Sequence, residues 1–258
     1  MSKTINILSV GDIVGKAGRT ILSDKLRGLI DANRVDLVVV NGENAAGGRS
    51  ITPDIFRDFM KLDIDVVTMG NHVWDNKDVL KIIDEERLLR PANFPPMARG
   101  KGFCNIKKKG LTITVINLMG RALMHPLDCT FRTFDNIYEK HCKNSDIVVV
   151  DFHAETTSEK RALGWYLDGR ASVVFGTHTH VQTADEEILP GGEGYITDIG
   201  MTGAFDSVIG NEKKQAINRF MSQMNAKIEI AEGNPKLNGA LFTVDSSGKT
   251  VGIRRISV

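Results

Sequence analysis

The amino-acid sequence predicts an α/β fold in which two mixed sheets pack face to face between layers of helices. Short apolar runs of β type alternate with stretches of helical periodicity through most of the chain, which is typical of α/β rather than segregated α+β proteins. The 258 residues, 41% of them hydrophobic, suffice for a large core. No repeat, low-complexity tract or flexible linker interrupts them, so we expect a single domain over residues 1–258.

Five of the apolar runs predict central strands, and each run ends in a polar side chain. Three of these ends follow a glycine, which permits a tight turn. In open α/β sheets, ligands bind in the crevice beyond the carboxyl ends of the strands. The runs with their polar ends are 5–10 with Gly11-Asp12, 36–41 with Gly42-Glu43-Asn44, 64–69 with Gly70-Asn71-His72, 146–152 with His153, and 172–177 with His178-Thr179-His180.

Periodicity and turn residues predict the remaining elements. Apolar residues at helical spacing indicate a helix at about 15–33. Thr52 and Pro53 indicate a helix start, with Thr52 as the N-cap and Pro53 at the first helical position. The proline-rich segment 91–96 must be a loop. Further helices are expected near 77–87, 133–143, 158–169 and 212–224, and further β runs near 103–107, 112–118, 194–198, 227–231, 240–244 and 250–256.

The histidines at the strand ends point to a metal centre. On extended backbone, successive side chains alternate between faces, so His178 and His180 should point the same way. Neutral imidazole is the commonest protein metal ligand, and four of the six histidines (His72, His153, His178 and His180) follow predicted strands. The alternative is five independent polar strand ends, but their joint occurrence favours one site. Donors that are all nitrogen or oxygen suit iron, manganese or zinc.

Composition excludes several other classes of protein. The net charge of +1 provides no global field for nonspecific capture of nucleic acid, so we expect no strong nucleic-acid binding. The apolar runs are too short for a membrane helix, and the first residues lack the apolar region of a secretory signal. The three cysteines are scattered and odd in number, which fits a reducing cytoplasm and argues against a disulfide framework.

The ordered set of strand ends resembles the motifs of the calcineurin-like metallophosphoesterases, which have an αββα sandwich and two metal ions. The match covers residues 5 to about 210. Two departures narrow it: Val14 stands where the usual first motif has a histidine, and Glu43 followed by Asn44 replaces the usual bridging aspartate. Together with the segments 90–95, 117–121 and 197–203, these departures resemble the YmdB-type branch of bacterial cyclic-nucleotide phosphodiesterases. That resemblance implies a di-iron, cytoplasmic homo-oligomer.

The resemblance also implies a role for each residue of the set. Glu43 would bridge two metal ions; Asp12, Asn44 and His180 would complete the first site, and Asn71, His153 and His178 the second. His72 lies next to a metal ligand and would act as the general acid. Asp75 would either orient His72 or cap the following helix. Three further residues are weaker candidates. Arg121 would contact the substrate or pair with a surface acid, and Asn93 and Thr179 would line the pocket or support the metal ligands.

These assignments predict a dimetal phosphodiesterase that hydrolyses 2′,3′- or 3′,5′-cyclic nucleotides, or both, by attack of a metal-bound hydroxide. Iron is the metal that the resemblance implies, and manganese or zinc would also suit the donors. Two alternatives stay open. A phosphomonoesterase or an RNA nuclease would use the same metal centre, and a regulatory protein would sense a nucleotide without turning it over.

Overall fold

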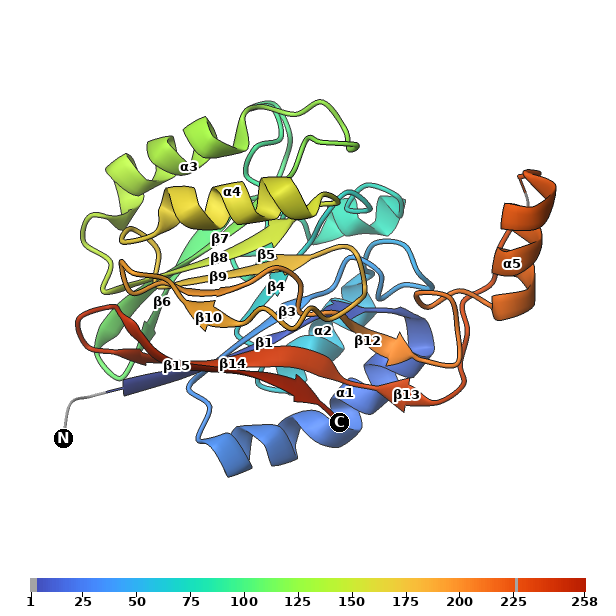
Figure 1. The fold of residues 1–258 in the computed structure, drawn as a ribbon, viewed down its shortest axis with the longest axis horizontal. Coiled ribbons are helices and arrows are strands. Elements are labelled where there is room, and N and C mark those ends of the chain that lie inside the picture. Colours follow the sequence, from blue (N-terminus) through green and yellow to red (C-terminus); the bar gives the residue numbers. More distant parts are fainter. Residues whose placement is uncertain (1–3, 226) are drawn as a thin grey trace.

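Two six-stranded mixed sheets form the body of the protein in a computed structural model that describes residues 4–225 and 227–258 (Figure 1). In the first sheet, β1, β3, β4 and β5 are parallel, and β14, antiparallel to β1, pairs antiparallel with β15 at the edge. Its strands, in spatial order, are β15 (Thr250–Ser257), β14 (Asn238–Asp245), β1 (Thr4–Val10), β3 (Leu37–Asn41), β4 (Val66–Thr68) and β5 (Leu88–Leu89).

In the second sheet, β11, β9, β8 and β7 are parallel, while β10 and β6 pair antiparallel at the two edges. Its order is β10 (Glu187–Ile188), β11 (Gly194–Ile196), β9 (Val173–Thr177), β8 (Ile147–His153), β7 (Leu111–Met119) and β6 (Phe103–Lys108). A small third sheet joins β13 (Pro235–Lys236), β12 (Met201–Ala204) and β2 (Asp12–Ile13).

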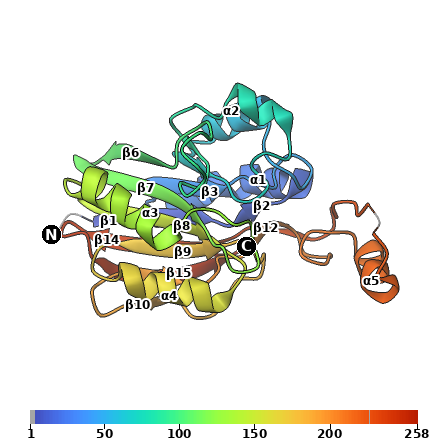
Figure 2. The same cartoon turned by 90° about the horizontal axis from the view of Figure 1, so that it is seen from above.

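Helices cover the outer faces of both large sheets (Figure 2). The first sheet is covered by α1 (Gly15–Asn33) and α2 (Pro53–Lys61), followed by a short 3-10 helix, η1 (Lys77–Lys81). The second sheet is covered by α3 (Thr130–Ile137), which continues into a π-helical turn, η2 (Tyr138–Cys142), and by α4 (Thr157–Leu167). The last helix, α5 (Lys213–Ser222), stands away from the body on an arm of the chain.

Three clusters of buried apolar side chains separate the layers. One joins α1 and α2 to the first sheet through residues such as Leu22, Phe59 and Val40. The second lies between the sheets, where the other face of β1 meets the second sheet. The third packs α3 and α4 onto the outer face of the second sheet, through Phe134 and Leu163. Because side chains alternate along each strand, a central strand can serve two clusters. The predicted α/β fold with two mixed sheets is confirmed, and these clusters order it as αββα.

Two expected elements are wrong. The helix expected at 77–87 stops after η1, because the Arg87 carbonyl accepts a hydrogen bond from Val67 and the chain must be extended to form β5. The β run expected at 227–231 is absent from the described part of the arm, where Ile230 makes only an isolated bridge to Asn211. The short strands β12 and β13 were not expected, since their pairing depends on tertiary contacts.

One buried carboxyl group has no partner. Glu193, in the turn between β10 and β11, is fully buried, and neither carboxylate oxygen has a hydrogen-bond partner among the described residues. Burial, with Asp168 adding to it, raises the pKa of Glu193 to about 10. The side chain is therefore neutral in the folded protein at pH 7. A buried polar group without a partner costs about 1–3 kcal/mol.

Glu193 should make the protein less stable as the pH rises. The folded-state pKa lies above the ordinary value of 4.5, so unfolding releases a proton between about pH 4.5 and pH 10, and stability falls across that range. Glu193→Gln should therefore raise the free energy of unfolding at pH 8 and change it much less at pH 5, measured by urea unfolding. The exposed Glu139→Gln is the control. Equal effects of Glu193→Gln at both pH values would contradict the assignment.

Candidate metal centre

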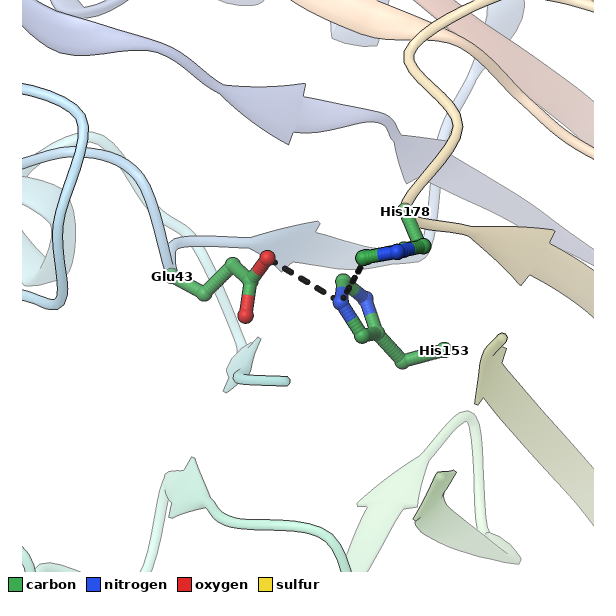
Figure 3. A group of neighbouring side chains, drawn as sticks. All are labelled: Glu43, His153 and His178. Carbon is green, nitrogen blue, oxygen red and sulfur yellow. Dashed lines mark hydrogen bonds and ion pairs between the residues drawn. The ribbon is translucent and has the colours of Figure 1, made fainter. Parts of the chain in front are cut away.

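The strand ends that carry the predicted ligands meet at one end of the sandwich. Asp12 follows β1, Glu43 and Asn44 follow β3, and Asn71 follows β4, all from the first sheet. The histidines His153, His178 and His180 come from β8 and β9 of the second sheet. Neighbouring parallel strands place their carboxyl ends at the same edge. Glu43, His153 and His178 therefore point toward one another across the gap between the sheets (Figure 3).

His153 lies at the centre of this group. Its Nε2 atom is 3.0 Å from Glu43 Oε1, 2.9 Å from Asn71 Oδ1 and 3.0 Å from His178 Nδ1. A ring nitrogen carries at most one proton, so it cannot donate to three such atoms. A cation shared by these electron pairs would satisfy all of them, and Glu43, His153 and His178 form a group that could hold a metal ion.

The remaining predicted ligands surround the same point. Asn44 Nδ2 is 3.2 Å from His180 Nε2 and 3.2 Å from Glu43 Oε1. Asp12 is fully buried; its Oδ2 accepts a hydrogen bond from the His178 backbone N–H, but its Oδ1 has no partner among the described residues. That oxygen lies 3.8 Å from His180 Nε2. An unpartnered buried carboxylate oxygen beside imidazole nitrogens is what a hard or borderline cation requires.

The charges of the group also fit a cation. Burial opposes a charge on His153, but the adjacent Glu43 carboxylate outweighs it and raises the pKa of His153 to about 9. Burial likewise opposes the charge on Glu43, and His153 nevertheless holds the pKa of that carboxyl at about 2. The cluster of carboxylates thus attracts positive charge strongly enough to keep a buried imidazole protonated. The donors present therefore fit a metal centre.

Contacts behind each imidazole fix which nitrogen faces the centre. His153 Nδ1 lies 2.9 Å from Thr177 Oγ1, whose hydroxyl donates to the buried Asp151 at 2.8 Å. Thr177 must therefore accept the proton of His153 Nδ1, which leaves Nε2 toward the centre. His180 Nδ1 lies 2.9 Å from the Ile209 carbonyl, so its Nε2 faces inward. Such contacts orient metal-binding histidines and set their tautomers.

Glu155 orients the ring of His178, and sequence reasoning did not identify this residue. Its carboxylate lies 2.9 Å from His178 Nε2. Burial and the neighbouring His153 lower the pKa of His178 to about 3, so the ring is neutral. Its one proton is donated to Glu155, and the Nδ1 electron pair faces the centre. The only sequence signal was a carboxylate two residues beyond His153.

Removing the Glu155 carboxylate should weaken cation binding. Glu155→Ala should lower metal affinity about 10- to 100-fold, the usual cost of losing a group that orients a metal-binding histidine. Glu155→Gln keeps an acceptor without the charge, so its loss should be smaller. Competition with a chelator measures the affinities, and the exposed Glu85→Ala is the control. Unchanged affinity in Glu155→Ala would show that His178 does not depend on this contact.

The backbone at His178 and His180 differs from the expectation. Strand β9 ends at Thr177, and the two histidines have φ values of 96° and 65°, so they lie in a bend and not on extended backbone. Two carboxylates hold the bend: Asp12 accepts from the His178 N–H, and Asp198 accepts from the N–H and hydroxyl of Thr179. Both imidazoles still face the centre, but the turn rather than strand alternation places them there. Backbone in this region costs about 1–3 kcal/mol.

Gly70 allows the Asn71-His72 loop to approach the centre. A Cβ atom on this glycine would lie 2.3 Å from Glu43 Oε2 and 2.3 Å from His153 Nε2. The loop then brings the His72 N–H to 3.1 Å from Glu43 Oε2. No larger residue would leave room for this arrangement.

His72 is half-exposed beside the cluster, and its Nδ1 lies 2.9 Å from Asp75 Oδ2. Asn76 caps the following 3-10 helix, since its side chain accepts from the Asp78 N–H at 3.0 Å. Of the two roles considered for Asp75, the helix cap is therefore wrong, and the contact with His72 is observed.

A cavity of about 720 Å³ opens over this group, lined among others by Glu43, Asn44, His72, His178 and His180. Thr179 also lines it, whereas Arg121 and Asn93 do not. Arg121 is exposed; its backbone N–H donates to Glu159 and its carbonyl accepts from the Met124 N–H, while its guanidinium has no hydrogen bond among the described residues. Asn93 is buried and ties Met119 to Asp128. A larger cavity of about 1040 Å³ lies beside edge strand β6, away from every predicted ligand.

The relatives of this chain, named a phosphodiesterase and a phosphatase, identify it as a phosphoric-ester hydrolase. A model of the YmdB-like protein family matches residues 8–256, so the chain belongs to the YmdB-like family. The resemblance seen in the sequence is confirmed by this match, and so is the expected class of enzyme.

Similar proteins from several bacteria match nearly the whole chain. The 2′,3′-cyclic-nucleotide 2′-phosphodiesterase of Bacillus subtilis (strain 168) is 43% identical over 256 residues, which are 98% of this chain and 97% of that protein. The crystal structure of a hypothetical protein from Thermus thermophilus has a TM-score of 0.94 and 39% identity, covering 98% of this chain and 99% of that one. A novel phosphatase from Mycoplasma pneumoniae has a TM-score of 0.95 and 35% identity, covering 100% and 94%.

Proposed function

We propose that the chain is a dimetal phosphodiesterase whose substrates are cyclic nucleotides, foremost 2′,3′-cyclic nucleotides. The observation that carries this proposal is the convergence of Asp12, Glu43 and Asn71 with three imidazoles next to one cavity, which Glu43, His178 and His180 line. The Bacillus subtilis relative, named for 2′,3′-cyclic-nucleotide hydrolysis, supports the 2′,3′ substrate. Activity on 3′,5′-cyclic nucleotides is the second possibility that we propose to test.

In this proposal the ligands form two groups around Glu43. Asn44, His180 and Asp12 lie around one side, with Asn44 Nδ2 3.2 Å from both Glu43 Oε1 and His180 Nε2. Asn71 and His178 lie with His153 on the other side. Two cations held by these groups, iron first and manganese or zinc as alternatives, would supply Lewis acidity toward a water molecule and the phosphoryl oxygens.

The proton for the leaving group would come from His72. Asp75 accepts from Nδ1 and leaves Nε2 of the ring toward the cavity. A protonated imidazole held by a carboxylate is a general acid suited to the alkoxide that leaves when a ribose ester is cleaved. The His72 backbone N–H donates to Glu43, which would hold this residue beside a phosphate bound at the centre.

One set of assays tests this function against its alternatives. The protein is loaded with iron, manganese or zinc and given 2′,3′-cyclic AMP, 3′,5′-cyclic AMP, an aryl monophosphate or an RNA oligomer. We expect the highest kcat/KM for 2′,3′-cyclic AMP and no turnover after chelation. Faster turnover of the monophosphate or of internal RNA bonds would replace the proposed substrate class. Nucleotide binding without turnover would identify a sensor.

We also propose, from the family resemblance, a cytoplasmic homo-oligomer. Within the described residues, no helix combines the length and apolar character needed to cross a bilayer. Light scattering coupled to size-exclusion chromatography would measure the assembly, and a mass equal to that of one 28.4 kDa chain would contradict the oligomer.

A further inference from the structure

Three cationic side chains line the same cavity as the metal centre. Arg49 comes from the loop after β3, and Arg219 and Lys227 come from the arm that carries α5. All three residues are exposed. In the part of the chain that the structure describes, none of their charged groups has an ion pair or a hydrogen bond to a protein acceptor.

Acidic groups of the cavity do not neutralise them. The only carboxylates lining the cavity, within the described residues, are Glu43 and Glu155, and both are engaged by histidines. Thus the rim of the cavity carries uncompensated positive charge in addition to any cations on its floor. The net charge of +1 shows that this is a local feature and not part of a basic surface.

The two walls that carry these cations are held against each other. Ile230 of the arm packs on the loop residue Gly48 and on Gly15, where added Cβ atoms would lie 2.5 Å and 2.8 Å from its side chain. The backbone bridge between Asn211 and Ile230 fixes the arm at this point. Arg49 follows Gly48 directly, so its position relative to the arm is set by this contact. Ile209, Ile228 and Ile230 add apolar surface to the same cavity.

The cavity is large enough for a ligand that carries more than one charged group. Pockets for small ligands span about 300–1,000 Å³, and this one measures about 720 Å³. A cyclic mononucleotide carries one negative charge, which the metal centre would already bind. Arginine and lysine without partners at the rim are suited to a further phosphate, since guanidinium binds phosphate oxygens in pairs and ammonium attracts them as a point charge.

We propose that Arg49, Arg219 and Lys227 form a subsite for a second phosphate, so that the preferred substrate is a 2′,3′-cyclic phosphate that bears another phosphate on its 5′ side. This inference rests on the proposed phosphodiesterase function. Two sources share this chemistry: a 5′-phosphorylated nucleoside 2′,3′-cyclic phosphate, and an oligonucleotide that ends in a 2′,3′-cyclic phosphate. The second phosphate would be bound in the ground state and in the transition state alike, and would act on KM rather than kcat.

Steady-state kinetics on three substrates test the subsite. The metal-loaded protein is assayed with 2′,3′-cyclic AMP, with its 5′-phosphorylated form, and with a dinucleotide whose terminal adenosine carries the 2′,3′-cyclic phosphate. We expect KM to be about tenfold lower, or more, for the substrates with the second phosphate. A lower KM for both of these substrates would show that a terminal 5′-phosphate is sufficient. A lower KM for the dinucleotide alone would show that the subsite binds the end of an oligonucleotide.

Variants assign the gain to the three cations. Arg49→Ala, Arg219→Ala and Lys227→Ala should each reduce the preference and leave the kinetics on 2′,3′-cyclic AMP unchanged. Lys214→Ala, on the same helix as Arg219 but outside the cavity lining, should retain the full preference. Equal KM values for the three substrates in the unmodified protein, with 2′,3′-cyclic AMP turned over, would overturn the subsite alone. Absence of turnover on all three would refute the phosphodiesterase itself.

Discussion

Glu43→Gln is expected to empty both cation positions and to lower turnover of 2′,3′-cyclic AMP by about 1,000-fold or more. The carboxylate lies between the two groups of ligands and is the nearest negative charge to His153, at 3.0 Å. Glutamine keeps the shape of the side chain but loses the charge that draws cations into the buried site. Loss of the cations removes several kcal/mol of transition-state stabilisation, and each 1.36 kcal/mol corresponds to about a tenfold change in rate.

Metal content by plasma mass spectrometry and kcat/KM should be measured on the same preparations. Glu85→Gln, an exposed glutamate outside the cavity lining, is the matched control and should retain metal and activity. The apo Glu43→Gln protein should be less stable than the unmodified protein, because His153 stabilises the Glu43 charge in the folded state, so far-UV circular dichroism should confirm that the variant is folded. Full occupancy of both positions in this variant would refute the bridging role.

His72→Ala should lower turnover of 2′,3′-cyclic AMP by about 10²- to 10⁴-fold while both cations remain bound. The imidazole is held by Asp75 at 2.9 Å and by its own backbone, and its ring makes no hydrogen bond to a predicted ligand among the described residues. Its removal should therefore cost the proton donor and not the metal. Parallel loss of metal would reassign His72 as a ligand.

The choice of leaving group separates proton donation from a structural effect. When an aryl phosphodiester is hydrolysed, the leaving group is a phenolate, which needs much less help from a proton donor than an alkoxide does. His72→Ala should therefore lose much less activity on an aryl phosphodiester than on the cyclic nucleotide. Asp75→Asn should follow the same pattern with a smaller loss. His125→Ala, a histidine outside the cavity lining, is the control. Equal losses on both substrates would contradict the general-acid role.

Much of this site was predictable because each predicted ligand stands directly after an apolar strand. Parallel strands bring their carboxyl ends together, so local patterns such as Gly42-Glu43-Asn44 and Gly70-Asn71-His72 already implied a shared location. The same local signals predicted α1 and the start of α2, where Thr52 accepts from Ile55 as an N-cap does. These inferences needed only side-chain alternation and capping chemistry.

What sequence reasoning missed depends on contacts between distant segments. The carbonyl of Ile209 orients His180 across 29 positions, and a backbone group leaves no side-chain pattern to read. The bend at His178 arises because Asp12 and Asp198, far apart in the chain, both accept from it. The position of the arm over the cavity depends likewise on Ile230 meeting Gly48. Each of these is tertiary and leaves no trace in the periodicity.

The oxygen donors of the centre and its imidazoles come from different sheets. Asp12, Glu43, Asn44 and Asn71 all follow strands of the first sheet, and His153, His178 and His180 all come from strand ends of the second. Cations that bind both sets would therefore fasten the two halves of the sandwich together. Cation binding should therefore raise the free energy of unfolding, by about 2.7 kcal/mol at a free cation concentration roughly a hundredfold above Kd.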